Sequence, residues 1–86
     1  MVIKEFNKFH RKIIRDMFYD TRIAGRHTSE DNILKGFPKS ERGDVKDALH
    51  DLIKENLIIP KKSTGEIHVS LNPDRLSDIN KIIEQS

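Results

Sequence analysis

The sequence predicts a mainly helical domain with a small β-hairpin, in the order helix, helix, helix, hairpin, helix. Two observations lead to this prediction. In four segments, apolar residues recur every three or four positions, which is the spacing of one face of an α-helix. Before the last of these segments, residues 57–71 combine β-branched residues with turn-forming residues, as a β-hairpin does.

The first segment predicts a long amphipathic helix from about Lys4 to Arg22. The residues of its apolar face are Phe6, Phe9, Ile13, Ile14, Met17 and Phe18. Glycine readily adopts the left-handed conformation that ends many helices, so Gly25 is expected to stop this one.

The next two segments predict a short helix and a longer one, separated by a tight turn at residues 37–40. Thr28 or Ser29 can cap the short helix with a hydroxyl group. The apolar residues of this helix are Ile33, Leu34 and Phe37. Ser40 is expected to cap the longer helix, which should run to about Asn56. The apolar face of the longer helix comprises Val45, Ala48, Leu49, Leu52 and Ile53.

A β-hairpin is predicted for residues 57–71. Residues 57–59 are aliphatic, residues 62–66 favour a turn, and residues 67–71 alternate apolar with polar side chains. Pro60 cannot donate a ladder hydrogen bond, so it belongs on an edge strand. A few residues around His27 are expected to add a short strand to the hairpin.

A last amphipathic helix is predicted after the hairpin. Asn72 can cap it, and Pro73 suits its first position. Its apolar residues are Leu76, Ile79, Ile82 and Ile83. This face either closes the core or pairs with its twin in a homodimer, and the sequence leaves both alternatives open.

Three helices followed directly by a two-stranded wing form the winged variant of the helix-turn-helix. We therefore predict one winged helix-turn-helix domain over residues 1–86. Residues 36–46 (GFPKSERGDVK) and 68–73 (HVSLNP) resemble small, uncharacterised archaeal proteins of the winged helix-turn-helix superfamily, a likeness that covers roughly residues 5–83. Residues 49–59 look like the junction of recognition helix and strand in many winged-helix transcription regulators. The resemblance implies the fold more directly than the function, because winged helices also dock proteins.

Composition narrows the class of protein. The 86 residues contain no cysteine, whereas small domains outside the cell usually carry disulfides, so we expect a cytoplasmic protein. Charged residues appear by the fourth position, so the N-terminus lacks the apolar run of a signal peptide. No stretch of apolar residues is long enough to span a membrane. The formal net charge of +2 permits contact with phosphate without requiring it.

No catalytic or metal site is expected. The sequence has four histidines: His10, His27, His50 and His68. They are not four residues apart, as two metal-binding histidines on one helix would be, and they have no cysteine partners. Spacing alone shows no arrangement of nucleophile, base and orienting acid. We therefore expect neither an enzyme nor a bound cofactor.

The start of the third helix is the first candidate binding site, and it comprises Lys39, Ser40, Arg42 and Lys46. A helix N-terminus offers free amides and positive potential to phosphate, and this end of a recognition helix usually enters the major groove of DNA. An arginine there can also bind a guanine edge. Alternatively, the two cations on the helix itself form weak surface ion pairs with Glu41 and Asp44.

Lys61 and Lys62 form the second candidate site, because they precede the turn of the wing. A flexible basic hairpin can lie along the DNA backbone or the minor groove. Lysines on an edge strand also discourage aggregation. The sequence supports both interpretations equally.

Two further charged surfaces bear on these sites. The outward face of the third helix is expected to carry Gly43, Asp47, His50, Asp51 and Lys54. The two carboxylates on that face would repel phosphate. The first helix carries a basic stripe opposite its apolar face, formed by Lys8, Arg11, Lys12, Arg15 and Arg22. We favour a solvated surface for this stripe over a second phosphate contact or a dock for an acidic partner.

These features favour a nucleic-acid-binding protein. Double-stranded DNA is the expected partner, and a small transcription regulator or nucleoid-associated factor is the expected class. A protein-docking winged helix and an RNA-binding module remain as alternatives. A steep loss of binding with salt would separate nucleic-acid binding from protein docking.

Overall fold

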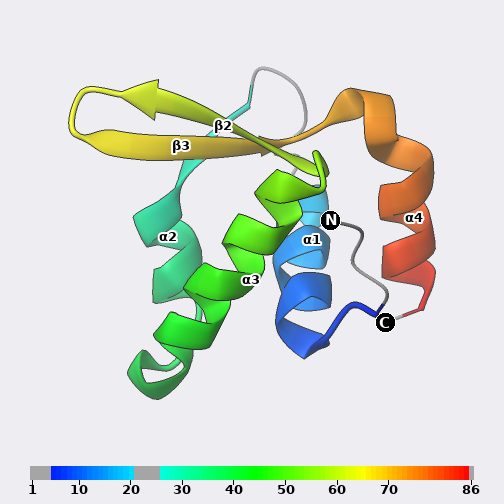
Figure 1. Ribbon diagram of the computed structural model, residues 1–86, viewed down its shortest axis with the longest axis horizontal. Coiled ribbons are helices and arrows are strands. Elements are labelled where there is room, and N and C mark those ends of the chain that lie inside the picture. The colour runs from blue at the N-terminus through cyan, green and yellow to red at the C-terminus, as the bar shows by residue number, and fades with distance from the viewer. Residues whose placement is uncertain (1–4, 21–25, 86) are drawn as a thin grey trace.

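The computed structural model describes residues 5–20 and 26–85 of the chain. The described residues follow the predicted order, including the short strand before the second helix, and two 3-10 turns are added (Figure 1). The elements are α1 (Lys8–Tyr19), β1 (Thr28–Ser29), α2 (Glu30–Lys35), the 3-10 turn η1 (Lys39–Glu41), α3 (Arg42–Lys54), β2 (Ile58–Ser63), β3 (Glu66–Leu71), the 3-10 turn η2 (Pro73–Arg75) and α4 (Leu76–Glu84).

The strands form an antiparallel sheet in the order β1-β3-β2, and the helices lie on one side of it (Figure 1). The short strand predicted around His27 is β1, in which Thr28 pairs with Val69. Pro60 lies in the edge strand β2, as predicted, opposite Val69 of β3. The predicted turn at residues 62–66 is too long, because Ser63 still pairs with Glu66.

A two-residue turn therefore closes the wing, which we define as residues 58–71. Gly65 has a φ of 75°, a left-handed conformation that glycine adopts without strain. A Cβ built there would meet no atom within 4 Å, so the backbone conformation and not crowding favours glycine at this position.

One hydrophobic core joins α1, α3, α4, β2 and β3, and residues of α2 pack against it. Its buried residues include most of the apolar faces predicted for α1, α3 and α4, and they are Ile13, Ile14, Met17, Val45, Ala48, Leu49, Leu52, Ile79 and Ile82. The other apolar residues predicted for the helices are partly buried, except Phe37, which is buried, and they include Ile33 and Leu34 of α2. The sheet adds Ile58, Val69 and Leu71 from its helix-facing side. α1 lies at the centre of this arrangement, because it contacts α3, α4 and β3.

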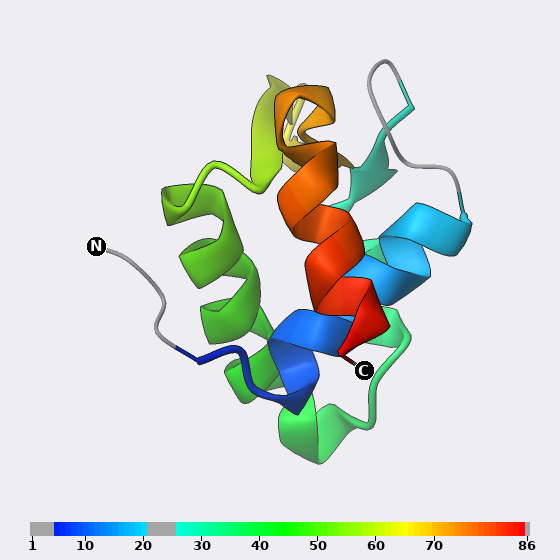
Figure 2. The ribbon, with the colours of Figure 1, turned by 90° about the vertical axis from the view of Figure 1, so that its right-hand side faces the viewer.

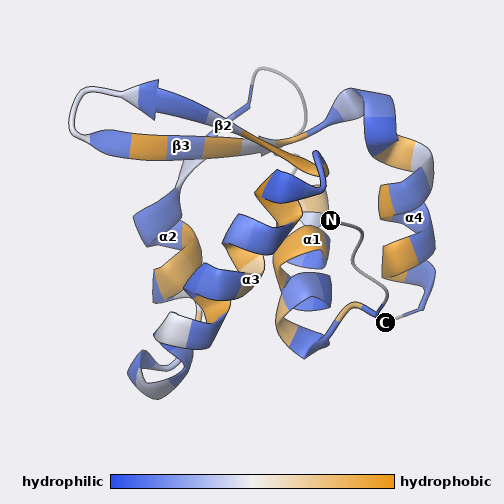
Figure 3. Ribbon diagram, in the orientation of Figure 1, coloured by the Kyte–Doolittle hydropathy of each residue, from blue (hydrophilic) through white to orange (hydrophobic). Residues whose placement is uncertain are grey.

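The last helix closes the core. α4 packs across α1 (Figure 2), and its apolar residues lie on the side that faces α1 (Figure 3). Ile79 is fully buried and Ile82 is 5% exposed. Asn72 caps the preceding 3-10 turn by accepting a hydrogen bond from the Asp74 N–H at 3.0 Å. Of the two roles left open for the apolar face of α4, the structure shows the core role.

The start of α1 lies later than the sequence predicts. Lys4 is outside the described residues, and the helix begins only after Asn7, whose side chain accepts hydrogen bonds from the Phe9 and His10 N–H groups. His10 Nδ1 accepts in return from the Asn7 N–H at 3.0 Å, which completes a capping box with histidine as its third residue. The predicted end near Arg22 and the stop at Gly25 lie outside the described residues, and α1 itself ends at Tyr19.

The start of α3 also differs from the prediction. Ser40 does not cap it, because Ser40 lies inside η1 and the residue before α3 is Glu41. The chain turns directly after Pro38, whose extended ψ of 147° ends the preceding segment, so the first helical turn forms one residue before Ser40. The serine is therefore already within the turn that it was expected to cap.

The end of α3 is fixed by backbone geometry. Asn56 takes a left-handed φ of 61° just past the helix. The Leu57 N–H donates to the Leu52 carbonyl at 3.1 Å, and the Asn56 N–H donates to the Ile53 carbonyl at 3.0 Å. This pair of bonds is a Schellman motif, in which asparagine takes the place that glycine often fills. The motif sends the chain from α3 directly into the wing.

We expect His10→Ala to lower the free energy of unfolding by about 2–3 kcal/mol. The substitution removes half of the capping box and a ring that is only 4% exposed. Chemical denaturation with urea measures the loss. His50→Ala is the matched control, because His50 is exposed on α3 and should change stability by less than about 0.5 kcal/mol. Equal losses in the two variants would contradict the capping role.

Candidate nucleic-acid interface

The first candidate site lies where η1 passes into α3. Lys39 and Ser40 are exposed on η1, and Lys46 is exposed one turn into α3. Within the described chain, neither η1 nor α3 receives a hydrogen bond from a capping side chain. The N–H groups of Glu41 and Arg42 already donate to the carbonyls of Pro38 and Lys39. What this end offers a phosphate is therefore the positive end of the α3 dipole and the exposed lysines.

Arg42 has a structural role that the sequence did not reveal. Its side chain is half-buried, and Nε donates to the main-chain carbonyl of Leu34 at 3.1 Å and to that of Phe37 at 3.3 Å. These carbonyls belong to the last turn of α2 and to the loop that follows it. Arg42 thus satisfies acceptors at the end of α2 from the first residue of α3, and so links the two helices of the helix-turn-helix.

The carboxylates of α3 do not all face outward. Asp44 and Asp47 are exposed, as predicted for Asp47. Asp51 was expected on the same outward face, but it is half-buried and its Oδ2 lies 3.1 Å from Nε2 of His10. Because Nδ1 of His10 accepts a hydrogen bond, we assign the ring proton to Nε2, which then donates to Asp51. One of the two expected repulsive charges is therefore held against α1.

The two lysines of the wing lie on opposite faces of the sheet. Lys62 pairs with Ile67 and shares the helix-facing side with the buried residues Val69 and Leu71. Lys61 pairs with His68 on the other side of the sheet. Both lysines are exposed, so only Lys62 combines access to solvent with the side of the wing on which α3 lies.

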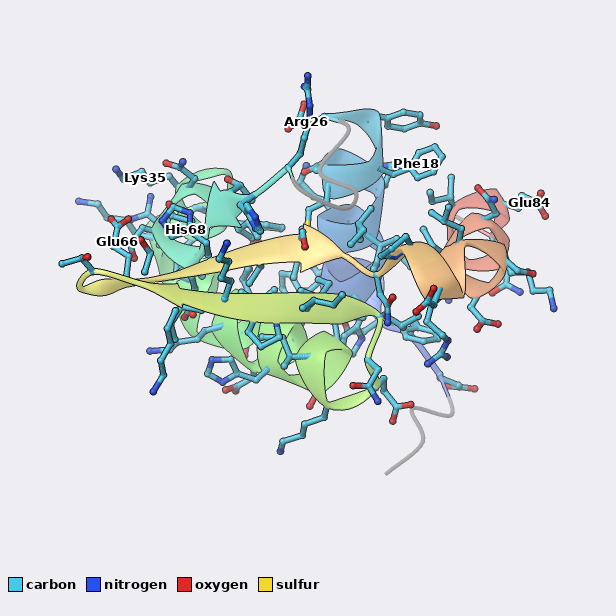
Figure 4. The ribbon with its side chains drawn as sticks, turned by 90° about the horizontal axis from the view of Figure 1, so that it is seen from above. Phe18, Arg26, Lys35, Glu66, His68 and Glu84 are labelled. Atoms are coloured by element: carbon cyan, nitrogen blue, oxygen red, sulfur yellow. The ribbon has the colours of Figure 1, made fainter. Side chains whose placement is uncertain are left out.

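The outer side of the wing has its own charge pattern. His68 Nε2 lies 3.2 Å from Glu66 Oε2, and Figure 4 shows both residues at the end of the molecule that also carries Lys35 of α2. A carboxylate and a histidine therefore accompany Lys61, whereas Lys62 has an apolar cross-strand partner. The two lysines differ in electrostatic setting as well as in direction.

The basic stripe of α1 lines a cleft, which the sequence did not predict. Lys8, Arg11, Lys12 and Arg15 form one side of this cleft, whose other side is the loop between α2 and α3. Arg22 lies outside the described residues. No signal in the sequence places residues 36–38 against this stripe, because the contact depends on how α2 packs. The described chain contains no group of three or more histidine, aspartate or glutamate side chains placed to hold a metal ion.

We expect Arg42→Ala to lower the free energy of unfolding by about 1.5–3 kcal/mol, because two carbonyls lose a charged donor. Urea denaturation measures this loss. Lys46→Ala, on the same helix but exposed, is the control and should stay within about 0.5 kcal/mol of the parent protein. An Arg42→Ala variant as stable as this control would show that the link between the helices contributes nothing in solution.

Comparison with known proteins concerns the fold. No family model and no curated protein matches the sequence of this chain. A crystal structure described as a "possible transcriptional regulator for arsenical resistance" is similar to it, with a TM-score of 0.70 and 17% sequence identity, over 98% of this chain and 84% of that one. Within residues 5–20 and 26–85, no helix has the length and apolarity to cross a membrane. With the observed element order, the similarity confirms the predicted winged helix-turn-helix fold.

Proposed function

We propose that this protein binds double-stranded DNA through the start of α3 and the wing, as a small transcription regulator or nucleoid-associated factor. The observation that carries the proposal is the group of exposed polar residues at the start of α3, namely Lys39, Ser40 and Lys46, at the positive end of the helix dipole. Proteins commonly hold DNA phosphates with lysine side chains, and the positive end of a helix favours a phosphate. The similar crystal structure, described as a possible transcriptional regulator, supports the same class of function.

The remaining predicted site residues have different parts in this proposal. Arg42 keeps the start of α3 in place through its bonds to two carbonyls, and its terminal nitrogens are the groups that would reach the DNA. Lys62 contacts the phosphate backbone of the DNA from the side of the wing on which α3 lies. Lys61, on the opposite face, contributes to the overall positive field and not to a direct contact.

The carboxylates of α3 set a limit on how the helix approaches DNA. Asp44 and Asp47 are exposed, whereas Asp51 is bonded to His10. Entry by the N-terminal end of the helix brings Lys39 and Ser40 to the phosphates first and keeps Asp47 further from them. The proposal therefore requires an end-on approach and excludes a helix laid flat in the groove.

We expect the double substitution Lys39→Ala/Lys46→Ala to weaken binding to duplex DNA by about 1–3 kcal/mol. Because each lysine displaces about one counterion, the slope of log K against log salt should become shallower by about two. Mobility-shift titrations against mixed duplexes at several salt concentrations measure both effects. Lys81→Ala, an exposed lysine on α4, is the control and should change neither.

Two results would contradict the DNA proposal. Binding that does not fall with salt in the parent protein would favour the protein-docking alternative, since nucleic-acid contacts release counterions. Stronger binding of single- or double-stranded RNA than of duplex DNA in direct competition would favour the RNA-binding alternative. Either result leaves the winged helix-turn-helix fold unaffected.

The wing supplies a matched pair of variants. Lys62→Ala should reduce the salt slope by about one, whereas Lys61→Ala should leave it nearly unchanged, because the two side chains lie on opposite faces of the sheet. The same mobility-shift titration measures the difference. If Lys61→Ala has the larger effect, DNA approaches the outer face of the sheet and the start of α3 is not the main contact.

A homodimer through α4 stays a prediction. Ile79 and Ile82 are buried in the core of the single chain. A dimer would therefore use the part of the helix that the core leaves half-buried, which includes Leu76 and Ile83. Two copies would present two α3 helices to successive turns of the groove, as dimeric helix-turn-helix proteins do. A DNA-binding function is also consistent with the cytoplasmic location that the lack of cysteine predicts.

A further inference from the structure

A cleft on the first helix is separate from the proposed DNA contacts. It lies between the basic stripe of α1 and the loop between α2 and α3, and its volume is about 380 Å³. Small-molecule sites in proteins typically have volumes of about 300–1,000 Å³, so this cleft is at the small end of that range. We call it the α1–loop cleft.

Two aromatic rings give the α1–loop cleft its apolar surface. Phe9 of α1 is half-buried and Phe37 of the loop is 6% exposed. Their ring centroids are 6.1 Å apart at an interplanar angle of 61°, an edge-to-face arrangement. Pro38 adds a further apolar edge. A flat aromatic body can extend this cluster by the same edge-to-face contact.

Cations surround this apolar surface. The lining includes Lys8, Arg11, Lys12 and Arg15, against a single carboxylate, Glu41. The Lys8 ammonium lies 5.1 Å from the Phe9 ring centroid, and the Lys12 ammonium lies 5.4 Å from that of Phe37. The cations thus sit directly beside the rings, so one ligand can contact both.

Most of this charge is not neutralised within the described part of the chain. Lys12 pairs with Asp16 at 2.9 Å, but Asp16 does not line the cleft. Arg11 Nε is buried and has no acceptor among the described residues. A buried N–H group without an acceptor costs free energy, and a water molecule or a ligand is the partner that would recover it. An oxyanion bound to the Arg11 guanidinium would supply that partner.

We propose that the α1–loop cleft binds a small anion with a flat aromatic body, of the aromatic carboxylate class. Arginine suits both parts of such a ligand, because its guanidinium can donate two parallel hydrogen bonds to a carboxylate and can stack on an aromatic face. A bare phosphate would leave the Phe9 and Phe37 surface unused, and a neutral aromatic compound would leave the cations unpaired. The proposal does not depend on DNA binding, since every residue that it uses lies on α1 or the loop before α3.

The test uses the full chain in solution, without DNA. The probe is 2-naphthoate, followed by amide chemical shifts in ¹⁵N NMR spectra. We expect saturable shifts at Gly36 and Phe37, with a dissociation constant on the order of 1 mM or tighter. The neutral 2-naphthalenemethanol and the small anion acetate should each bind at least about tenfold more weakly, because each lacks one of the two contacts.

A variant pair assigns the contacts. Arg11→Gln/Arg15→Gln should weaken 2-naphthoate binding by at least about tenfold, whereas Lys54→Gln/Lys81→Gln, which removes the same charge elsewhere, should not. Circular dichroism checks that both variants fold. If the arginine variant does not fold, the comparison of 2-naphthoate with its neutral analogue on the parent protein still decides the question.

Three outcomes would overturn the proposal. They are equal binding of 2-naphthoate and its neutral analogue, shifts that cluster away from residues 36–38, and unchanged affinity in a folded arginine variant. A fourth would replace it: loss of DNA binding in the arginine variant without any 2-naphthoate shift would make the basic stripe a nucleic-acid contact. Because the naphthoate titration contains no DNA, failure of the proposed function would not alter its result.

Discussion

The burial of one face of α1 is the constraint on which the rest of this structure depends. Ile13, Ile14 and Met17 are buried where α1 meets α3, α4 and the sheet. Fully burying a side chain of this size contributes about 1.5–3 kcal/mol, which is a large share of the stability of a small domain. The helix therefore cannot rotate, and the positively charged side chains on its other face must line its outer surface. The α1–loop cleft is a consequence of core packing.

Positive charge has two distinct physical roles in this chain. Arg42 is half-buried and directs its Nε to main-chain carbonyls, which makes it part of the scaffold. Lys39 and Lys46 are exposed and are available to a partner. The positions of these cations in the sequence do not separate the two roles. Only their hydrogen bonds distinguish a cation that holds two helices together from one that remains free to bind.

Features set by local sequence pattern could be predicted, and features set by packing between elements could not. The three-and-four spacing located the buried faces of α1, α3 and α4, and Ser29 does cap α2 by accepting from the Asn32 N–H. The cap of α3 was wrong because the turn after Pro38 forms earlier than Ser40. The direction of Asp51 depends on a histidine 41 residues earlier in the chain, which no local pattern reveals. For the candidate site, the sequence indicated which lysines are exposed but not which face of the wing each occupies.

The α1–loop cleft and the start of α3 meet at one short stretch of chain. Pro38 and Glu41 line the cleft, while Lys39 and Ser40 between them are exposed on η1. Pro38 and Lys39 are consecutive residues, with Cα atoms about 3.8 Å apart, so salt would only partly screen this lysine from negative charge bound in the cleft. It would lower the positive potential that a DNA phosphate meets there. If the cleft and the start of α3 both bind as proposed, the two ligands must therefore oppose each other, and each must weaken the other by the same factor.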